Sequence, residues 1–296
     1  MIYISVSEAA KKWDLSERSV RNYCAAHRIA GARLNGKTWE IPISAEKPVR
    51  QVRSDKKRTL LSVLREEKEA RLSGSVYHRI QIDLTYNSNH MEGSRLTHDE
   101  TRYIFETNTI GLDKKTVNVD DIVETANHFR CIDSVIDCAH LPLTERYIKE
   151  LHFLLKNGTS DSRRDWFKVG DYKKLPNEVG GMDTTAPPLV PEQMKVLLEL
   201  YNASPKKTLE EIIAFHVAFE RIHPFQDGNG RVGRLLMFKE CLRTDITPFI
   251  IDEEHKLFYY RGLKEWNRER GYLLDTCRSA QDSFRKMLAG FAINLT

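Results

Sequence analysis

The segment His223-Pro224-Phe225-Gln226-Asp227-Gly228-Asn229-Gly230-Arg231-Val232-Gly233-Arg234 brings together an imidazole, a carboxylate, a glycine-rich turn and two guanidinium groups. Apolar residues with helical spacing lie on both sides of it. The capping box Thr208–Glu211 starts the preceding helix, which Pro224 prevents from continuing, and a second helix is expected after Gly230. The segment therefore predicts a connection between two packed helices.

The glycine-rich turn predicts an anion-binding site. Gly228, Asn229 and Gly230 can adopt backbone angles that direct successive N–H groups toward one point, which also faces the positive end of the second helix. Arg231 and Arg234 add two guanidinium groups one turn apart at the same helix start. A hairpin turn is the alternative, but the flanking residues follow the helical period instead of alternating. A polyphosphate is the ligand that these groups favour.

Asp227 and His223 supply the remaining chemistry. Mg²⁺ usually binds one or two carboxylates together with phosphate oxygens, and Asp227 adjoins the predicted phosphate site. His223 can take a proton from an attacking hydroxyl near neutral pH. The segment thus contains the parts of a site that activates a hydroxyl beside a nucleotide phosphate.

The same segment resembles the motif HPFx[D/E]GNGRxxR of the Fic family and matches it at every defined position. The resemblance covers roughly residues 60 to 290 and implies a helical fold with a small β-hairpin flap. It also implies transfer of AMP from ATP to a tyrosine, threonine or serine hydroxyl of a protein. The resemblance implies that His223 is the general base and that Asp227 binds Mg²⁺. It implies that Gly228, Asn229 and Gly230 form the anion hole for the α- and β-phosphates. Arg231 would contact the β- and γ-phosphates, and Arg234 would contact the γ-phosphate.

Ser88-Asn89-His90-Met91-Glu92-Gly93 matches a second pattern of that family, the inhibitory motif [S/T]xxxE[G/N]. Ser88 and Glu92 are four residues apart and share one face of the helix expected over about 75–93, which Gly93 ends. The resemblance implies that Glu92 pairs with Arg234 and blocks productive seating of the γ-phosphate. In some relatives this glutamate also supports removal of AMP.

Residues 1–45 are predicted to form a separate domain. A short helix ending at Trp13, a turn and a second helix capped by Ser16 form a helix-turn-helix pattern, and Asn35-Gly36 predicts a hairpin after them. The pattern resembles the winged helix-turn-helix domains of the excisionase and mercury-resistance-regulator type. That resemblance implies DNA contacts from Ser16, Arg18, Ser19, Arg21, Asn22, Arg33 and Lys37. Docking of a protein by the same module is the alternative.

The net charge of +4 is unevenly distributed along the chain. Residues 1–60 contain 13 Lys/Arg against 6 Asp/Glu, and the remainder contains 33 against 36. A basic N-terminal segment favours an anionic partner such as nucleic acid, although a solvated basic surface has the same composition. Residues 46–59 have few apolar side chains and many charges, so they are interpreted as a linker.

The stretch between the linker and the His223 segment is predicted to be mainly helical. Leu60 opens one long helical region that continues past Leu84. Thr97-x-x-Glu100 is a capping box for a further helix, whose inward residues are expected to be Tyr103 and Ile104.

Two more helices are expected to begin near Asp120 and Leu143, whereas residues 169–191 are rich in turn residues and predict a β-hairpin or irregular flap. An exposed flap can pair its edge with an extended peptide, and a plain surface connection is the alternative.

Three histidines lack metal-binding spacing and are interpreted as core or surface residues with ordinary partners: His128, His140 and His152.

The segment after the second helix resembles the part of the family that lies beside adenine. Tyr259 or Tyr260 is therefore a candidate for the wall of that pocket, and core packing is the alternative for both. The five cysteines show neither a disulfide framework nor CxxC spacing, so buried free thiols are expected.

These patterns predict a mainly α-helical protein with three parts. A small winged helix-turn-helix domain (1–45) and a linker (46–59) precede a helical Fic domain (60–296), whose core spans about 97–290 and carries the β-hairpin flap. No apolar run is long enough to span a bilayer and the first residues lack a leader pattern, so a cytosolic protein is expected. The family resemblance also suggests a homodimer.

Three functions remain open at this point. The first is an autoinhibited protein adenylyltransferase that uses ATP and Mg²⁺, with removal of AMP as a further activity. The second is a DNA-binding transcriptional regulator whose Fic domain senses nucleotide. The third is transfer of another phosphate-containing group, as in divergent members of the family.

Overall fold

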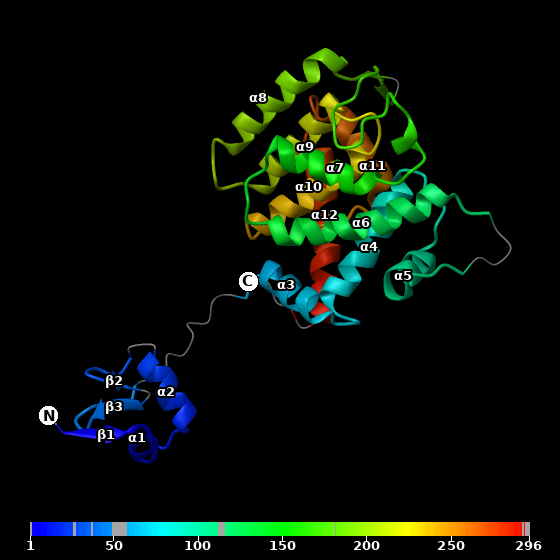
Figure 1. Cartoon of the computed structure of the whole chain (residues 1–296). Coiled ribbons are helices and arrows are strands. Elements are labelled where there is room, and N and C mark those ends of the chain that lie inside the picture. Colours follow the sequence, from blue (N-terminus) through cyan, green and yellow to red (C-terminus); the bar gives the residue numbers. More distant parts are fainter. Residues whose placement is uncertain are drawn as a thin grey trace. The chain divides into compact units, whose positions relative to one another are not determined.

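The computed structural model describes residues 2–25, 28–36, 38–48, 58–111, 116–180, 182–291 and 293 (Figure 1). The chain divides into two compact units, Met1–Lys57 and Arg58–Thr296, and each has its own hydrophobic core. Within the described residues, no helix is both long and apolar enough to cross a membrane.

The first unit combines two short helices with a three-stranded antiparallel sheet of order β1-β3-β2. Its elements are β1 (Tyr3–Ser5), α1 (Val6–Trp13), α2 (Glu17–Ala25), β2 (Arg33–Asn35) and β3 (Thr38–Pro42). The short β1 was not predicted, because three residues are too few to show an alternating pattern. Asn35 lies within β2 and pairs with Thr38, so the hairpin turn begins at Gly36, one residue later than the Asn-Gly pattern predicts.

Local capping explains where the two helices begin. Ser5 Oγ accepts a hydrogen bond from the N–H of Glu8 at 3.2 Å, and Ser16 Oγ accepts one from Ser19 at 3.2 Å. Between the helices, Asp14 adopts a left-handed conformation (φ +51°) that ends α1. The buried side chains that join the helices to the sheet include Ala9, Trp13, Val20, Cys24 and Ile41.

The second unit is a helical bundle with a small two-stranded hairpin. Its helices are α3 (Leu60–Ala70), α4 (Val76–Met91), α5 (His98–Thr107), α6 (Val119–Cys138), α7 (Glu145–Lys156), α8 (Val190–Asn202), α9 (Leu209–Ile222), α10 (Asn229–Arg243), α11 (Glu253–Glu265) and α12 (Gly271–Gly290). Short 3₁₀ turns cover Asp161–Arg163 and Pro187–Leu189, and the hairpin is β4 (Glu178–Val179) with β5 (Met182–Asp183). The predicted helical fold with a hairpin flap is confirmed.

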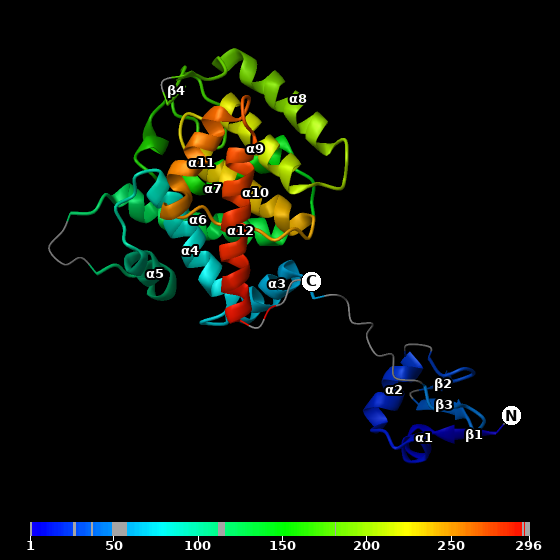
Figure 2. The same cartoon turned by 180° about the vertical axis from the view of Figure 1, so that it is seen from behind.

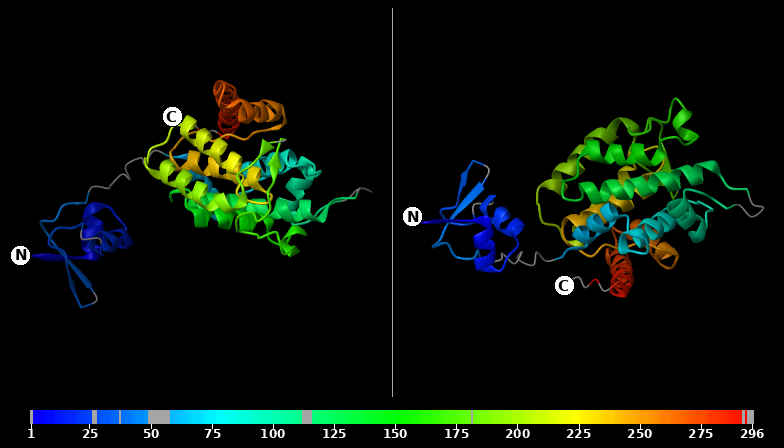
Figure 3. Two further views of the ribbon diagram at one scale, coloured as in Figure 1. Left: turned by 90° about the horizontal axis from the view of Figure 1, so that it is seen from above. Right: turned by 60° about the horizontal axis from the view of Figure 1, so that its bottom comes forward.

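The helices of the second unit surround α10. Every residue from Arg231 to Leu242 is buried, because α3, α4, α6, α7 and α9 all pack against this helix. The views from opposite sides both show α10 near the middle of the bundle (Figures 1 and 2). α11 and α12 lie side by side at one edge, drawn in orange and red in Figure 3. α10 is therefore enclosed by five helices that precede it in the chain.

Two predicted features of this unit are wrong. The long helical region after Leu60 is two helices, since Arg71 (φ +49°) and Gly74 (φ +66°) have left-handed backbone between α3 and α4. Tyr103 is 46 % exposed, and α5 instead buries Thr101 and Ile104. These two residues are three apart and share a face of the helix, and Tyr103 lies outside that face.

The predicted helix starts and thiols agree with the structure. Both capping boxes are formed, by Thr97 with Glu100 at α5 and by Thr208 with Glu211 at α9. All five cysteines are free; Cys138 is partly buried and the other four are buried.

Candidate active site at the start of helix α10

The two helices predicted around the His223 segment meet as expected, with one difference. α9 ends at His223, whose φ of +49° is left-handed, and Gly228 (φ +82°) immediately precedes α10. The second helix thus begins before Gly230 and not after it, so Asn229 and Gly230 belong to its first turn. The first N–H groups of a helix have no acceptor within it, and they favour an anion at this position.

Asn229 fixes the connection between the two helices. Its Oδ1 accepts a hydrogen bond from the N–H of Phe225 at 2.8 Å, and its Nδ2 donates to the Phe225 carbonyl at 2.8 Å. The residue is 1 % exposed. Its side chain is therefore structural, and only its backbone N–H is available to a ligand.

His152 of α7 supports the same connection from the other side. Its ring lies parallel to that of Phe225, with centroids 4.0 Å apart. Nδ1 accepts a hydrogen bond from Gly170 at 2.9 Å, so Nε2 carries the proton that is donated to the Asp227 carbonyl at 3.1 Å. Burial lowers the pKa of His152 to about 3. His152 is thus the core residue with ordinary partners that its sequence context predicts, but its contact with the site was not predictable, because the Asp227 carbonyl lies 75 residues later in the chain.

His223 has the protonation pattern of a general base. Its Nδ1 lies 3.3 Å from the carbonyl of Glu220, which can only accept, so Nδ1 carries the proton and Nε2 keeps its lone pair. Burial lowers the pKa of His223 to about 4, so the imidazole is neutral at pH 7. Burial also raises the pKa of the nearby Glu220 carboxyl to about 8. The neutral imidazole therefore presents a free lone pair at Nε2.

Arg234 is held by the end of α4. Its Nε donates to Ser88 Oγ at 3.0 Å, and its Nη2 donates to the Ser88 carbonyl at 2.9 Å and to Glu92 Oε1 at 2.6 Å. The Arg234 side chain is 5 % exposed and that of Glu92 is 31 % exposed. Gly93 (φ +94°) follows directly and turns the chain away from the helix. The structure thus contains the Glu92–Arg234 contact that the sequence pattern implies.

The Glu92 carboxylate also lies over the first turn of α10. A Cβ atom added to Gly230 would collide with Glu92 Oε1 and come within 2.9 Å of Arg234 Nη1. The absence of a side chain at Gly230 therefore allows a carboxylate to approach the backbone of the helix start. A nucleotide phosphate that bound this helix start and Arg234 would compete with Glu92 for the same position.

Four side chains from four parts of the unit form a closed ion-pair ring. Lys156 Nζ lies 2.6 Å from Asp227 Oδ2, and Arg231 Nη2 lies 3.2 Å from the same oxygen. Glu124 of α6 closes the ring, since it pairs with both Lys156 and Arg231. Glu124 and Lys156 were not predicted as site residues. We call these residues (Glu124, Lys156, Asp227 and Arg231) the ion-pair ring.

The ring determines the charge of Asp227. Burial alone would raise the pKa of this carboxyl, but the charges of Arg231 and Lys156 hold the pKa well below its usual range. Its side chain remains 48 % exposed, and the contacts with Lys156 and Arg231 both use Oδ2. Within the described residues there is no group of three or more His, Cys, Asp or Glu side chains that could hold a metal. A single half-exposed carboxylate fits a Mg²⁺ ion that takes most of its ligands from phosphate and water.

The flap is attached to the His223 segment at its base. The N–H of Lys173 donates to the Pro224 carbonyl at 2.8 Å. Its Nζ donates to Asn177 Oδ1 at 2.6 Å and to Thr184 Oγ1 at 2.5 Å, on the two sides of the β4–β5 hairpin. Lys173 is 4 % exposed, and burial lowers its pKa to about 8. The hairpin is therefore positioned relative to His223 by a buried lysine.

The two tyrosines of α11 have different surroundings. Tyr259 is 1 % exposed, and its hydroxyl lies 2.6 Å from His216 Nε2, so core packing describes it. Tyr260 is 40 % exposed and donates to the Met91 carbonyl at 3.2 Å, beside Glu92. Of the two, Tyr260 remains the candidate for a nucleotide contact.

The residues predicted to contact DNA lie mostly on the surface of the first unit. Ser16, Arg18, Arg21, Asn22 and Arg33 are exposed, and Ser19 is partly buried by its contact with Ser16. Lys37 lies outside the described residues, as does most of the predicted linker. Arg33 pairs with Glu40 across β2 and β3 at 2.8 Å.

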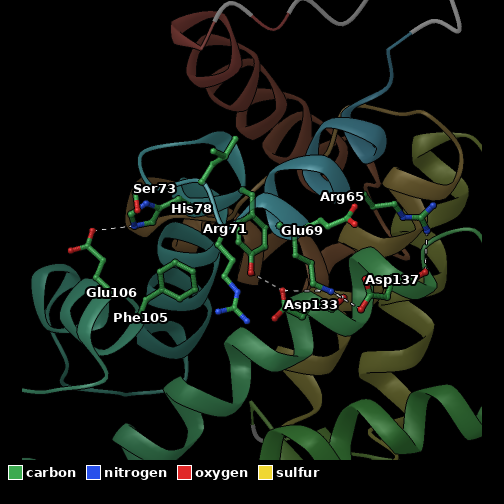
Figure 4. A pocket seen from close by; sticks show the side chains of 12 residues that line it. Arg65, Glu69, Arg71, Ser73, His78, Phe105, Glu106, Asp133 and Asp137 are labelled. Atoms are coloured by element: carbon green, nitrogen blue, oxygen red, sulfur yellow. Dashed lines mark hydrogen bonds and ion pairs between the residues drawn. The ribbon is translucent and has the colours of Figure 1, made fainter. Parts of the chain in front are cut away.

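A hollow of the second unit lies away from this site. It has a volume of about 1230 Å³ and is lined by residues of α3, α4, α5, α6 and the α3–α4 connection, among them Arg71, His78 and Asp133 (Figure 4). Its α4 residue His78 precedes Ser88 by ten positions, or roughly 15 Å along the helix. His78 points toward Glu106 (Figure 4). The Tyr77 hydroxyl donates a hydrogen bond to Asp133 Oδ1 at 2.8 Å. None of the residues of the His223 segment lines this hollow.

Comparison with protein families identifies part of this unit. Residues 142–241 match the model of the Fic/DOC family. The matched region includes α7, the flap, α9 and nearly all of α10. The chain therefore contains a Fic/DOC family domain, and the ion-pair ring and Glu92 connect that domain to α4 and α6, which precede the matched region.

Curated relatives and solved structures extend the similarity. The chain is 27 % identical over 225 residues to the protein adenylyltransferase Fic of Drosophila grimshawi, which covers 73 % of this chain and 44 % of the relative. It thus spans less than half the length of that relative. A Fic domain containing signaling protein from Bacteroides thetaiotaomicron superposes with a TM-score of 0.60 and 25 % identity over 77 % of this chain and 94 % of that chain. Residues 134–508 of Fic-1 from Caenorhabditis elegans share the fold, with a TM-score of 0.59 and 20 % identity over 78 % of this chain and 71 % of that chain.

Proposed function

We propose that the Fic/DOC family domain of this chain transfers AMP from ATP to a hydroxyl side chain of a protein, and that Glu92 inhibits this transfer. The observation that carries the proposal is the position of the Glu92 carboxylate, 2.6 Å from Arg234 and over the first turn of α10. The names of the curated relatives, which are protein adenylyltransferases, support the reaction class.

The proposed reaction uses the geometry of the His223 segment. The phosphates of ATP bind the N–H groups at the start of α10 together with Arg231 and Arg234. His223 Nε2 removes the proton of the target hydroxyl, whose oxygen attacks the α-phosphorus. The bond between the α-phosphorus and the bridging oxygen breaks, and diphosphate leaves. Mg²⁺ held by Asp227 and the phosphates would neutralise charge on the leaving group.

Inhibition follows from competition for one guanidinium group. Glu92 and the γ-phosphate both bind Arg234. ATP can therefore bind in the orientation needed for transfer only when the Glu92–Arg234 ion pair opens. A charge-assisted hydrogen bond contributes about 1.5–3 kcal/mol, so its removal is expected to raise the transfer rate roughly 10- to 100-fold. Removal of AMP is the further proposed activity, in which Glu92 positions the attacking water.

The test is incubation of Glu92→Gly protein with ATP labelled at the α-phosphate and with Mg²⁺, followed by detection of label on the protein itself and on lysate proteins. We expect strong labelling by Glu92→Gly, weak labelling by the unchanged protein and none by Glu92→Gly/His223→Ala. Glu253→Gln is the matched control, because Glu253 lies near the same helix end but is 65 % exposed and faces His90. Equal labelling by Glu92→Gly and Glu92→Gly/His223→Ala would refute the proposal.

We propose as a second function that the first unit binds DNA, so that the chain acts as a DNA-binding regulator whose Fic domain senses nucleotide. The supporting observation is the exposed polar face of α2, which carries Arg18, Arg21 and Asn22 on a compact unit with its own core. An exposed helix face of this kind can enter the major groove. The first and second functions are compatible, because they use different units.

DNA binding is tested with the full chain and a random-sequence duplex in a mobility-shift titration over several salt concentrations. Replacement of Arg18 and Arg21 by Gln is expected to weaken binding and to reduce the slope of log K against log salt by about 2. Lys11→Gln, on α1, is the control and should change the slope less. No shift with the unchanged protein at low salt would refute this function.

A further inference from the structure

Lys156 is the most enclosed cation beside the proposed metal ligand. Its side chain is 3 % exposed, and its Nζ lies 2.6 Å from Asp227 Oδ2 and 3.5 Å from Asp161 Oδ2, with Glu124 as a third and closer partner. The ring of Phe167 lies 5.5 Å from the same nitrogen. Three carboxylates and an aromatic ring therefore hold this ammonium group in one position.

The charges around Lys156 are balanced without any further ion. Glu124, Asp161 and Asp227 contribute three negative charges. Lys156 and Arg231 contribute two positive charges, and Arg164 contributes a third through its pair with Asp161 at 3.4 Å. A divalent cation at Asp227 would add two positive charges to a neutral group in which Lys156 and Arg231 are enclosed, and uncompensated charge beside enclosed cations is costly. The phosphates of a nucleotide would bring the negative charge that compensates the metal.

We propose that Lys156 is a positioning residue that neutralises Asp227, so that a divalent metal ion binds Asp227 together with a nucleotide polyphosphate and only weakly without it. This inference rests on the proposed function in that it takes Asp227 as the metal ligand. Lys156 and Arg231 both contact Oδ2 of Asp227, and the carboxylate is still 48 % exposed, so a metal can reach it. The same ammonium group places a fixed positive charge beside the start of α10, where the phosphates are proposed to bind.

The test measures binding of Mn²⁺ to the full chain without nucleotide, by the loss of its free electron paramagnetic resonance signal. The unchanged protein is expected to bind Mn²⁺ weakly at this site. Lys156→Met should bind it at least about tenfold more tightly, because a positive charge next to Asp227 is removed. Adding Asp227→Asn to Lys156→Met should abolish the gain and so locate the metal. Partial unfolding of Lys156→Met would not explain tighter Mn²⁺ binding, because a loss of structure alone does not create a new metal site.

Lys149→Met is the matched control. Lys149 lies on the same helix and pairs with two carboxylates, Glu145 at 2.8 Å and Asp171 at 3.0 Å, but it does not contact Asp227. Its replacement should leave Mn²⁺ binding unchanged. The α,β-methylene analogue of ATP cannot release AMP. In its presence, the unchanged protein should bind Mn²⁺ as tightly as Lys156→Met binds it without nucleotide.

Two outcomes would overturn the inference. One is a Lys156→Met protein whose Mn²⁺ affinity equals that of the unchanged protein, and the other is tight binding at Asp227 by the unchanged protein without nucleotide. If Lys156→Met does not fold, Glu124→Gln/Lys156→Met removes one charge of each sign, and a smaller gain in Mn²⁺ affinity is expected, because only the ammonium group in contact with Asp227 is lost while the net charge stays the same. These measurements require no AMP transfer, so failure of the labelling experiment with Glu92→Gly would leave them interpretable.

Discussion

Arg231 and Arg234 lie one turn apart on α10, and a glutamate from another helix holds each of them. The pair of Arg231 with Glu124 is enclosed, since the two side chains are 5 % and 12 % exposed and both belong to the ion-pair ring. The pair of Arg234 with Glu92 is open at one edge, since Glu92 is 31 % exposed and lies at the end of α4.

The difference in exposure suggests different roles for the two arginine–glutamate pairs. Removing one member of an enclosed pair leaves a buried charge without a partner, whereas a half-exposed pair can open toward water. A ligand that competes for Arg234 displaces Glu92 alone, but displacement of Glu124 would also disturb Lys156. We therefore infer that Glu124 maintains the site and that Glu92 regulates it.

The largest expected effect is on the free energy of unfolding. Glu124→Gln should lower it by about 3–5 kcal/mol, because Lys156 and Arg231 remain buried with one carboxylate fewer. Glu92→Gln should lower it by only about 1 kcal/mol, because the pair is partly exposed and Ser88 still accepts two hydrogen bonds from Arg234. Urea unfolding of both variants measures the difference. Equal losses would mean that the two pairs do not differ as the burial indicates.

The next effect concerns pH and the histidine that lies near both arginines. His128 is fully buried, and its pKa is lowered to about 3 by burial and then by the charges of Arg231 and Arg234. In the unfolded chain its pKa is the ordinary value of about 6.5. Below pH 6.5 the unfolded chain therefore takes up a proton that the folded protein does not, and stability falls as the pH decreases toward 3.

For this one histidine the loss is up to about 1.4 kcal/mol per pH unit. His152 and His216 also have pKa values lowered to about 3 by burial and should add to the slope. Urea unfolding at pH 7, 6 and 5 measures how steeply the free energy of unfolding depends on pH. His128→Gln should reduce that slope by the contribution of this one histidine. An unchanged slope in His128→Gln would show that this imidazole is not held neutral beside the arginines.

The smallest effect is expected for an exposed pair of the same residue types. Arg33 and Glu40 lie 2.8 Å apart on the sheet of the first unit, with side chains 60 % and 29 % exposed. Arg33→Gln should leave the stability of the first unit unchanged within error, because surface ion pairs contribute little. Thermal unfolding followed by the circular dichroism of the full chain checks this. A clear loss would mean that exposure is a poor guide to the difference between the Glu92 and Glu124 pairs.

The helix boundaries near the site were predictable because their causes are local. A capping box, a glycine with positive φ or a proline acts on residues within a few positions of itself. The start of α10 was predicted a few residues too late, because Asn229 and Gly230 are compatible with either a loop or a first helical turn. The break between α3 and α4 was missed because Arg71 and Gly74 lie within an otherwise helical pattern.

Sequence motifs were enough to predict a helical domain with a connection that carries an imidazole, a carboxylate and two guanidinium groups, and the family resemblance implied Glu92 as the partner of Arg234. The other side chains that complete the site became visible only in the packed structure. Lys156 and Glu124 lie 71 and 107 residues from their partners Asp227 and Arg231, and no motif surrounds them. A lysine and a glutamate on helices are usually solvated, and packing of α6 and α7 against α10 is what removes these two from water.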